Sequence, residues 1–530
     1  MVTPSNTWKD IQQQAILPET FVEISCNISE VGLQEAAEVT GANEDIISEV
    51  GNILGTKQVS SMATKYATLE RNLWVLDGSR SIAPASSPRP NVGYVGELDF
   101  DTGVVVTLPA VRTAEIPGVT IMWSSEYGEY PTAFSVTAKN GTAEVATITV
   151  ENNDSNLSVV DLPMSNYDSV AISVSEWCLP DHRTRIDRVT LGHSIVFDKN
   201  DIISYTHEQY GDLNSGEIPK NSIEFSVDNT DGKWNPANPS GLVKYLAERQ
   251  RITVRYGMDI GGAVEWIKAG TFYLSEWRTP SSGVIATFVA RDIFEYLMNE
   301  SYTGVTSGTL QQLVQGALSS SDVPEDFTAD VDGSLGNYSA TIVNEYSAAE
   351  VVQMCANATC CVMYQDREGV LHIKPFNGAH TGYILGTELA FFHPEMDLSK
   401  QLKNVSVSYT GSEEPFVLNV GTKGETQTVD NPIVSTRQQA ADIAAWVRNM
   451  MKTRKSVSGE FRADPCLDVF DVITIESKYG SISPVVITDI LYRYTGSFTA
   501  SYKGRVISSS SDPAILGQMI LGVSILGQGA

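Results

Sequence analysis

The sequence predicts a mainly β protein of the α+β class, in which antiparallel β-barrel or sandwich domains carry short helical inserts and one inserted β jelly roll. Short runs of alternating apolar and polar residues recur along most of the chain, as one-sided burial of strands requires. Pairs such as Asn140-Gly141 and Asp231-Gly232 separate these runs and are typical of turns. A chain of 530 residues exceeds what one hydrophobic core usually supports, so several domains are expected.

The first segment, residues 1–85, is predicted to supply the N-terminal part of a first barrel. Its clearest strand covers residues 20–28, where apolar residues occupy every second position. Pro84, Pro88 and Pro90 then lie among Ser and Ala, which disfavours both helix and sheet. We interpret this stretch as a linker.

The second segment, residues 92–192, is predicted to be an independent jelly roll inserted into that barrel. Short alternating runs at 119–123, 134–137 and 169–174 are separated by turns, which is typical of a two-sheet β fold. The order of its elements resembles the galactose-binding-like jelly rolls. That resemblance rests on residues 116–121, 130–136 and 185–192.

Residues 193–300 are predicted to complete the first barrel, because their strands are longer and alternate cleanly. These strands cover residues 220–229, 250–256, 266–277 and 283–290. The segment 235–239, with two prolines, forces a loop between the first two of them.

The chain then gains helices, which predict an α+β subdomain at 301–400 and a second barrel with one helix at 401–507. The pairs Thr309 with Gln312, Ser347 with Glu350, and Ser435 with Gln438 each have the spacing of a capping box at a helix start. Strands are predicted on either side of the turn at residues 366–369, and the closing strands at 472–476, 484–494 and 497–507.

Composition excludes several classes of function. A net charge of −28 and a pI near 4.6 repel nucleic-acid phosphates and anionic lipid, so no nucleic-acid partner is expected. No apolar run reaches the length of a membrane span, and the start lacks the pattern of a secretory signal, which predicts a product made in the cytoplasm. The six cysteines are too sparse for a disulfide framework, and we predict buried thiols.

Familiar catalytic and cofactor motifs are missing from the sequence, so no enzyme activity, catalytic residue, metal or cofactor is predicted. The sequence contains no HExxH, GxSxG, P-loop or GxGxxG after a strand. The acidic segments 228–232 and 330–333 could suggest calcium, but neither completes an EF-hand loop, and turns explain them better.

The jelly-roll segment carries aromatic and basic residues near two strand–loop junctions. Such a mixture can stack on a sugar ring and bond its hydroxyl groups, which makes a host-surface glycan a candidate ligand. The alternative is that Trp123 belongs to the core and the others decorate loops. The candidate sugar contacts are Trp123, Tyr127, Tyr130, His182, Arg183 and Arg185.

The last segment, residues 508–530, holds three Ile-Leu-Gly units with a period of five. That period fits neither one face of a helix nor one face of a strand, and the repeated glycines would each cost a helix about 1 kcal/mol. An uncharged apolar strip is prone to association, so we predict an assembly segment; a disordered tail is the alternative. Its aliphatic residues are Ile515, Leu516, Ile520, Leu521, Ile525 and Leu526.

Beyond the jelly roll, the chain resembles the tail-hub or tail-tip proteins of tailed bacteriophages, also called baseplate-hub proteins. The order of its elements carries the resemblance, over about two thirds of the chain. The matching stretches are residues 216–229, 234–236, 269–274, 290–292, the Ser347 helix with the turn at 366–369, residues 468–473 and residues 486–490.

This resemblance implies a structural protein of the virion that forms a ring, typically a homotrimer, at the distal end of the tail. The implied neighbours are a distal tail ring, a tape measure, and a fibre or receptor-binding protein. Family members often carry a cell-wall hydrolase module at the C-terminus, and none is expected here because the chain stops soon after the final strand. The alternative is a carbohydrate-binding adsorption protein that acts through the jelly roll.

Overall fold

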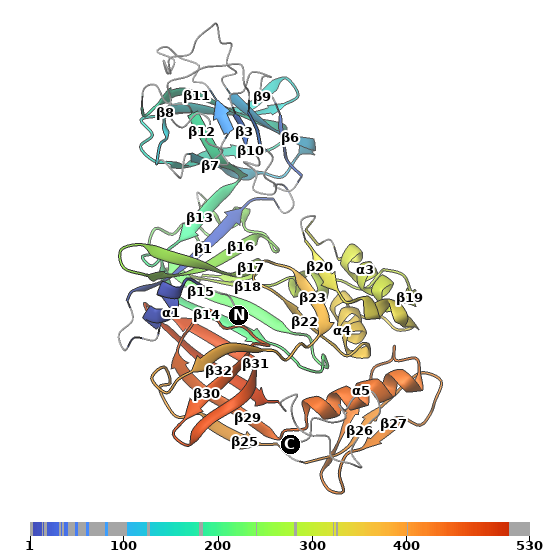
Figure 1. Cartoon of the computed structure of the whole chain (residues 1–530). Coiled ribbons are helices and arrows are strands. Elements are labelled where there is room, and N and C mark those ends of the chain that lie inside the picture. The colour runs from blue at the N-terminus through green and yellow to red at the C-terminus, as the bar shows by residue number, and fades with distance from the viewer. Residues whose placement is uncertain are drawn as a thin grey trace.

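The computed structural model has a β-sandwich at one end, joined through strands β1 (Thr20–Ile28) and β13 (His193–Phe197) to two barrel-like bodies with helical subdomains beside them (Figure 1). The predicted fold class, mainly β with antiparallel sheets and few helices, is confirmed. The structure describes residues 4–507 except 13, 15–17, 31–32, 34–35, 41–47, 51–59, 63–79, 83–102, 124–127, 180–183, 240, 280–282, 322, 325–326 and 400.

The first barrel-like body has its strands in the order β13-β1-β16-β17-β18-β15-β14. Burial in β1 alternates strictly, which is what the sequence pattern predicts. A short helix α1 (Asn6–Gln12) and a 3-10 helix η1 (Val243–Tyr245) accompany the strands. The strands are β1 (Thr20–Ile28), β13 (His193–Phe197), β14 (Ile202–Tyr210), β15 (Lys220–Asp228), β16 (Arg251–Asp259), β17 (Val264–Arg278) and β18 (Ile285–Arg291).

The second barrel-like body continues from β14 in the order β31-β32-β29-β25, and β30 pairs with β31 and with β24. The β24–β30 pairing is parallel, whereas the other pairings in this sheet are antiparallel. The strands are β24 (His380–Leu385), β25 (Glu395–Leu398), β29 (Lys455–Arg462), β30 (Val472–Ser477), β31 (Gly480–Tyr494) and β32 (Phe498–Val506).

Pairing between β14 and β31 makes the two bodies parts of one sheet. The register runs from Tyr205 opposite Tyr494 to Tyr210 opposite Asp489. One hydrophobic core spans both bodies, and residues such as Tyr256 and Tyr492 pack across the junction with ring centroids 6.1 Å apart. A shared sheet and a shared core resist relative motion of the two bodies, because separating them would expose apolar surface and unpair a strand.

The sandwich stacks a four-stranded sheet, β10-β7-β12-β5, on a five-stranded sheet, β2-β6-β11-β8-β9. β2 and β5 belong to residues 1–85, which the sequence assigned to the first barrel, and they pair with β6 and β12 of the sandwich instead. A separate pair is β3 (Ser48–Val50) with β4 (Ser60–Met62). The sandwich strands are β2 (Glu38–Thr40), β5 (Arg80–Ile82), β6 (Gly103–Arg112), β7 (Ile116–Trp123), β8 (Pro131–Asn140), β9 (Ala143–Glu151), β10 (Leu157–Met164), β11 (Tyr167–Trp177) and β12 (Thr184–Leu191).

The sandwich is inserted into what is otherwise a β-hairpin of the first barrel. β1 and β13 pair antiparallel, and Ile28 lies directly opposite His193. The polypeptide therefore leaves the barrel after β1 and returns at β13, one strand spacing away. The backbone NH of Gly192 donates to the Gly118 carbonyl at 2.8 Å, and the amide of Ser194 donates to Thr120 Oγ1 at 2.8 Å. These bonds tie the hairpin to the base of the sandwich.

Two helical subdomains share a second core beside the barrels. The first combines α2 (Phe294–Met298), α3 (Leu310–Ser320), α4 (Ala348–Ala358) and the 3-10 helix η2 (Gly333–Asn337) with two small sheets, β19-β21 and β20-β23-β22. The second combines α5 (Arg437–Met450) with the sheet β27-β26-β28. The strands are β19 (Ser307–Thr309), β20 (Ala329–Val331), β21 (Ser339–Thr341), β22 (Cys361–Gln365), β23 (Leu371–Pro375), β26 (Leu402–Val407), β27 (Phe416–Asn419) and β28 (Glu425–Val429).

The helix starts test the capping predictions residue by residue. Thr309 and Ser347 each cap their helix through a complete capping box, as predicted. The prediction of Ser435 as the third cap was wrong by one residue, because the Thr436 side chain accepts the bond from the amide of Gln439. The Gln439 side chain in turn accepts from the amide of Ser435 at 2.9 Å, so the helix begins one position later.

Candidate functional site

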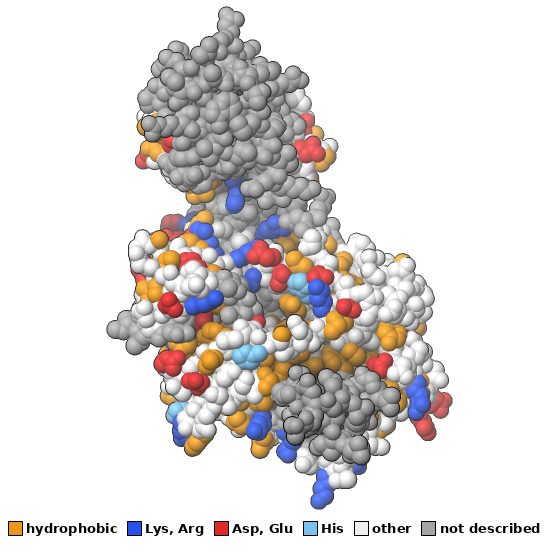
Figure 2. All heavy atoms as spheres, viewed as in Figure 1, with side chains coloured by type: hydrophobic (Ala, Val, Ile, Leu, Met, Phe, Trp, Pro, Cys, Tyr) orange, Lys and Arg blue, Asp and Glu red, His pale blue; other side chains and the backbone are white. Residues whose placement is uncertain are grey.

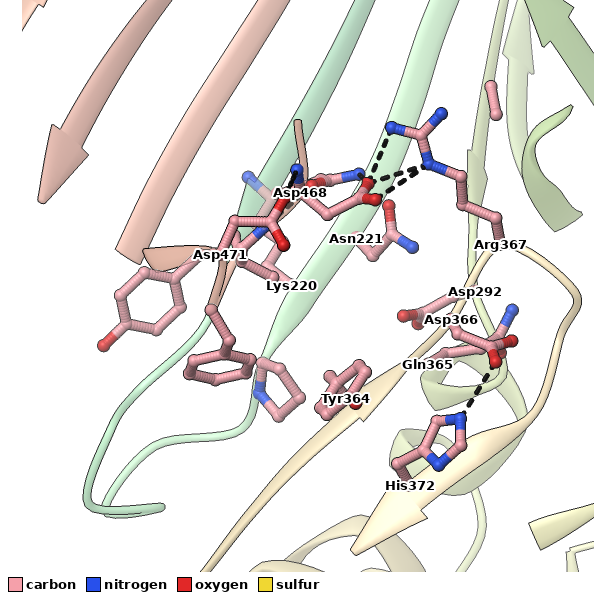
Figure 3. A pocket seen from close by; sticks show the side chains of 16 residues that line it. Lys220, Asn221, Asp292, Tyr364, Gln365, Asp366, Arg367, His372, Asp468 and Asp471 are labelled. Carbon is pink, nitrogen blue, oxygen red and sulfur yellow. Dashed lines mark hydrogen bonds and ion pairs between the residues drawn. The ribbon is translucent and has the colours of Figure 1, made fainter. Parts of the chain in front are cut away.

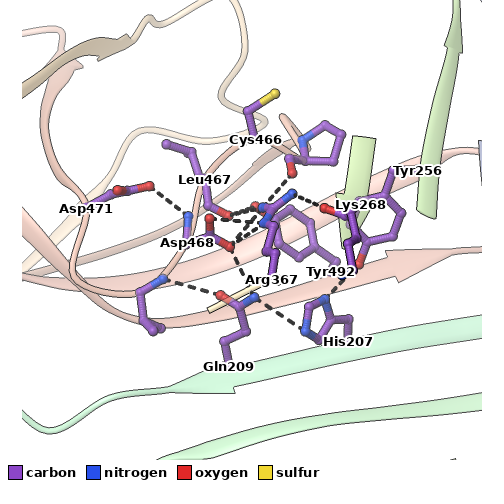
Figure 4. Close-up of polar contacts among 12 residues, drawn as sticks. His207, Gln209, Tyr256, Lys268, Arg367, Cys466, Leu467, Asp468, Asp471 and Tyr492 are labelled. Atoms are coloured by element: carbon purple, nitrogen blue, oxygen red, sulfur yellow. Dashed lines mark hydrogen bonds and ion pairs between the residues drawn. The ribbon is translucent and has the colours of Figure 1, made fainter. Parts of the chain in front are cut away.

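The candidate site lies where the two barrel-like bodies meet the first helical subdomain. The turn between β22 and β23 projects from that subdomain into the junction (Figure 4). The Asp366 amide donates to the Val370 carbonyl, and Gly369 completes the turn with a φ of +95°, a conformation that favours glycine. The turn holds the side chain of Arg367 against the second body, and this residue is 8% exposed.

Arg367 links the first helical subdomain to both barrel-like bodies. Its Nε donates to both carboxylate oxygens of Asp468, at 2.8 and 3.0 Å. Its Nη1 donates to the Lys268 carbonyl of β17 at 3.1 Å, and its Nη2 donates to the carbonyls of Pro465 and Leu467 at 2.8 and 3.1 Å. Burial by itself lowers the pKa of Arg367, but the Asp468 carboxylate beside it outweighs burial and raises the pKa overall. We call this cluster the Arg367 junction.

A row of buried polar side chains lies beneath the Arg367 junction. His207 Nε2 lies 2.7 Å from Asn221 Oδ1, and because that oxygen can only accept, Nε2 carries the proton. Nδ1 therefore accepts from the Tyr256 hydroxyl at 2.7 Å, and that hydroxyl accepts from Tyr205 at 2.8 Å. Burial lowers the pKa of His207 to about 4, so the ring is neutral at pH 7. The row is a satisfied structural network.

A cavity of about 250 Å³ opens beside the Arg367 junction (Figure 3). We call it the junction cavity. In Figure 2, charged and histidine side chains gather near the centre of the face shown, over the region where Figure 1 places β22 and β23. Carboxylates, aromatic rings and amides line the cavity together: Gln209, Tyr210, Pro219, Lys220, Asn221, Ala269, Asp292, Tyr364, Gln365, Asp366, Arg367, His372, Asp468, Val469, Phe470 and Asp471.

The histidine of the junction cavity contacts carboxylates on both sides. His372 Nε2 lies 2.9 Å from Asp366 Oδ2, and His372 Nδ1 lies 3.4 Å from Asp330 Oδ2, which also pairs with Lys374. A histidine that activates a side-chain nucleophile needs a hydroxyl or thiol within reach of one ring nitrogen. Both nitrogens of His372 face carboxylates instead, which is an arrangement for holding the β22–β23 turn in place.

The cysteines and the two acidic segments have contacts that fit structural roles. Burial raises the pKa of Cys26 and of Cys360 to about 12, so both thiols stay protonated at neutral pH. Asp228 accepts from the amide of Thr230, and Asp332 accepts from the amide of Ser334, which are turn and cap contacts. Among the described residues, no group of three or more His, Cys, Asp or Glu side chains is arranged to hold a metal.

Of the six candidate sugar contacts, the structure describes the side chains of Trp123 and Tyr130. The Trp123 side chain is completely buried, packs edge-on against Phe134, and donates to Ser158 Oγ at 2.9 Å. An indole without an exposed face does not stack on a sugar, so Trp123 belongs to the sandwich core. Tyr130 is half-buried at the end of the loop before β8. Tyr127, His182, Arg183 and the Arg185 side chain lie outside the described residues, as does the predicted assembly segment 508–530 with its three Ile-Leu-Gly units.

Sequence reasoning missed the residues that matter most at the junction, which are Arg367, Asp468, His207 and Asp292. Arg367 and Asp468 are 101 residues apart in the sequence, and Arg367 lies in a predicted turn, where charged residues usually face water. Only one signal was available for His207. It occupies an inward position of the alternating strand β14, where a polar residue must find partners.

Comparison with known proteins gives structural matches only. No family model and no curated protein matches the sequence. The 43 kDa tail protein of prophage MuSo2 from Shewanella oneidensis is similar at 14% identity over 59% of this chain and 95% of its own, with a TM-score of 0.42. A tail protein from Neisseria meningitidis MC58 is similar at 10% identity over 59% and 93%, with a TM-score of 0.42. Prophage tail protein gp18 from Listeria monocytogenes EGD-e is similar at 12% identity over 60% of this chain and 92% of its own, with a TM-score of 0.37.

None of the described helices is long and apolar enough to cross a membrane.

Proposed function

We propose that this chain is a structural hub protein of a bacteriophage or phage-like tail, located in the virion at the distal end of the tail. Three copies would form a ring that closes the tail tube and holds the distal tip or fibre components. The neighbours would be a distal tail ring, a tape measure, and a fibre or receptor-binding protein. The proposal assigns no enzymatic activity to the chain.

One observation carries this proposal. Apart from the Ser347 helix and the turn at 366–369, the segments that give the sequence its resemblance to tail hubs belong to two bodies that are joined by the β14–β31 pairing and share one core. A ring that transmits load between a tube and a tip needs such a stiff unit, and the Arg367 junction adds a third point of attachment. The strongly acidic composition also suits a conduit for DNA, because a negative wall repels phosphate and does not trap it.

The inserted sandwich supports an alternative function in host adsorption through carbohydrate binding. It lies at one end of the molecule, and the β1–β13 hairpin connects it to the barrel (Figure 1). Glu115 of the sandwich also accepts from the Tyr245 hydroxyl of η1 at 3.0 Å. A module attached in this way can contact a surface without disturbing the ring. The proposal for the barrels and the alternative for the sandwich can therefore be separated by one deletion.

We expect a variant in which Asn-Gly replaces residues 29–192 to fold and to enter the ring in three copies. Ile28 and His193 are directly opposite in the β1–β13 pair, and Asn-Gly is the favoured two-residue turn for such a hairpin. Deleting only residues 92–190 would leave β2 and β5 without their partner strands. The measurement is a cryo-EM map of particles carrying the variant, together with their binding to host cells.

The outcomes of this deletion distinguish the two functions. Assembled particles that no longer adsorb would assign receptor binding to the sandwich. Particles that assemble and adsorb normally would exclude that alternative. One or six copies at this position in the map, or normal tails in particles that lack the chain, would contradict the hub proposal.

The segment 508–530 is proposed to seat the next protein of the tip. The segment has no charged residue after Asp512, so its six aliphatic side chains form an apolar strip. Other copies of the chain or a partner protein would cover this strip. A chain truncated after Ser511 should keep its melting temperature, because the described cores end before that residue. Particles with this chain should lose the distal component, which quantitative mass spectrometry of purified tails would detect. If the particles retained every tip component, the segment 508–530 would not be the binding site for the next protein.

A further inference from the structure

The carboxyl group of Asp292 lines the junction cavity and has one oxygen without a hydrogen-bond partner in the described part of the chain. Asp292 follows β18 and begins the turn into α2, where its Oδ1 accepts from the amide of Phe294 at 3.1 Å. Its Oδ2 has no hydrogen-bond partner among the described residues, and the residue is only 2% exposed. Figure 3 shows this carboxyl pointing into the cavity. A buried polar atom without a hydrogen-bond partner lowers the stability of the fold. Such an atom at the wall of a cavity indicates that a ligand supplies the missing partner.

The walls of the cavity suit a short apolar stem. The rings of Tyr364 and Phe470 lie side by side with centroids 5.4 Å apart, and His372 stacks on Tyr364 at 5.1 Å. At about 250 Å³ the cavity is smaller than the roughly 300–1,000 Å³ typical of small-molecule sites. A single side chain fits that size better than a cofactor or nucleotide does. Aromatic faces also attract a cation that passes over them.

The basic side chains already in or near the cavity have other partners. Arg367 is bonded to Asp468 and to three carbonyl groups. Lys220 pairs with Glu208, and His372 lies between Asp366 and Asp330. On the helix side, Arg291 bonds Glu295 at 3.1 Å. Each of these basic side chains therefore contacts a carboxylate other than Asp292, and Asp292 Oδ2 is left for a group from outside.

We infer that the junction cavity binds one primary alkylammonium group, supplied in the assembled tail by a lysine side chain of a neighbouring protein. The ammonium would donate to Asp292 Oδ2 while its methylene stem lies along Tyr364 and Phe470. Lysine fits better than arginine because only one carboxylate oxygen is free, whereas a guanidinium fork uses two. The protein source of the lysine rests on the proposed function, but the ammonium chemistry does not.

Cation binding is coupled to a proton at this site. Burial, with a smaller contribution from Glu295, raises the pKa of Asp292 to about 8 against the opposing effects of the Phe294 amide and Arg291. The other charged groups that line the cavity are Lys220, Asp366, Arg367, His372, Asp468 and Asp471. At pH 7 the empty site is therefore protonated, and an arriving ammonium group displaces that proton. Affinity should rise between pH 6 and pH 8.5.

The test uses n-butylammonium as the probe and the full-length chain in calorimetric titrations at millimolar probe concentration. We expect binding at pH 8.5, at least tenfold weaker binding at pH 6, and release of a proton on binding at pH 7. Asp292→Asn should weaken binding at least tenfold and abolish the proton release. Glu368→Gln, which removes an exposed carboxylate on the same turn, should change neither.

Two further probes test the charge and the shape of the group that binds. n-Butanol has the same stem without the charge and should not bind, and n-butylguanidinium should bind more weakly than n-butylammonium. Equal binding of n-butanol, or unchanged binding by a cooperatively folded Asp292→Asn variant, would overturn the inference. Tighter binding of n-butylguanidinium would overturn the assignment to lysine. These titrations use the isolated chain and not assembled particles. A failure to bind n-butylammonium would therefore contradict only the cation site, whereas a failure to form the ring in the deletion experiment would concern the proposed function.

Discussion

Replacing Arg367 by leucine should lower the free energy of unfolding by about 3–5 kcal/mol, which is the usual cost of removing one partner from a buried ion pair. The reason lies mainly in what is left behind. Asp468 would keep its charge near the interior without its counterion, and the carbonyls of Pro465, Leu467 and Lys268 would lose their donor. Chemical unfolding followed by circular dichroism measures the loss.

Three matched variants locate the origin of that loss. Arg367→Lys keeps the charge but cannot form the fork, so an intermediate loss is expected. Asp468→Leu alone leaves the guanidinium buried and should cost as much as Arg367→Leu. The double variant removes both charges, and its loss should be clearly smaller than the sum of the two single losses. A loss below about 1 kcal/mol for Arg367→Leu would show that the junction does not hold the bodies together.

Local structure was largely predictable because it depends on neighbouring residues. The strand at 20–28 was predicted to the residue from its alternation, and the caps at Thr309 and Ser347 from the spacing of a hydroxyl and a Glu or Gln. The third cap was one residue off because Ser435 and Thr436 are adjacent and both can cap. A single hydrogen bond decided between them.

Long-range pairing was not predictable from the same patterns. Nothing in β14 or β31 indicates that strands so distant in sequence become neighbours, since alternation specifies which face is buried and not which strand lies alongside. For the same reason, β2 and β5 could not be assigned to the sandwich. Arg367 was overlooked because its turn carries charged residues that usually face water, and only the fold places this turn between two bodies.

A binding role for the junction cavity would explain why Asp292 is present in the core although its burial lowers the stability of the folded chain. Asp292 holds its proton until about pH 8 in the folded chain, whereas an exposed aspartate loses its proton near pH 4. Between these values the unfolded chain is ionised and the folded chain is not, so stability falls as the pH rises from about 4 and levels off above about 8. A residue with this effect at neutral pH is disfavoured by folding alone, and a binding role would offset that disadvantage.

Asp292→Asn should therefore stabilise the isolated chain at alkaline pH while it removes the cation site. The amide keeps the shape and can still accept the bond from Phe294, but it has no proton to lose. Its advantage over the natural chain should be near zero at pH 4 and grow to about 5 kcal/mol at pH 8, since each pH unit between the two pKa values corresponds to about 1.4 kcal/mol. Unfolding titrations at pH 4, 6, 8 and 9 measure the difference, with Glu368→Gln expected to follow the natural chain at every pH. A constant difference across this range would mean that Asp292 is ionised in the folded chain. Saturating n-butylammonium should narrow the difference at pH 8, because it stabilises only the chain that retains the carboxylate.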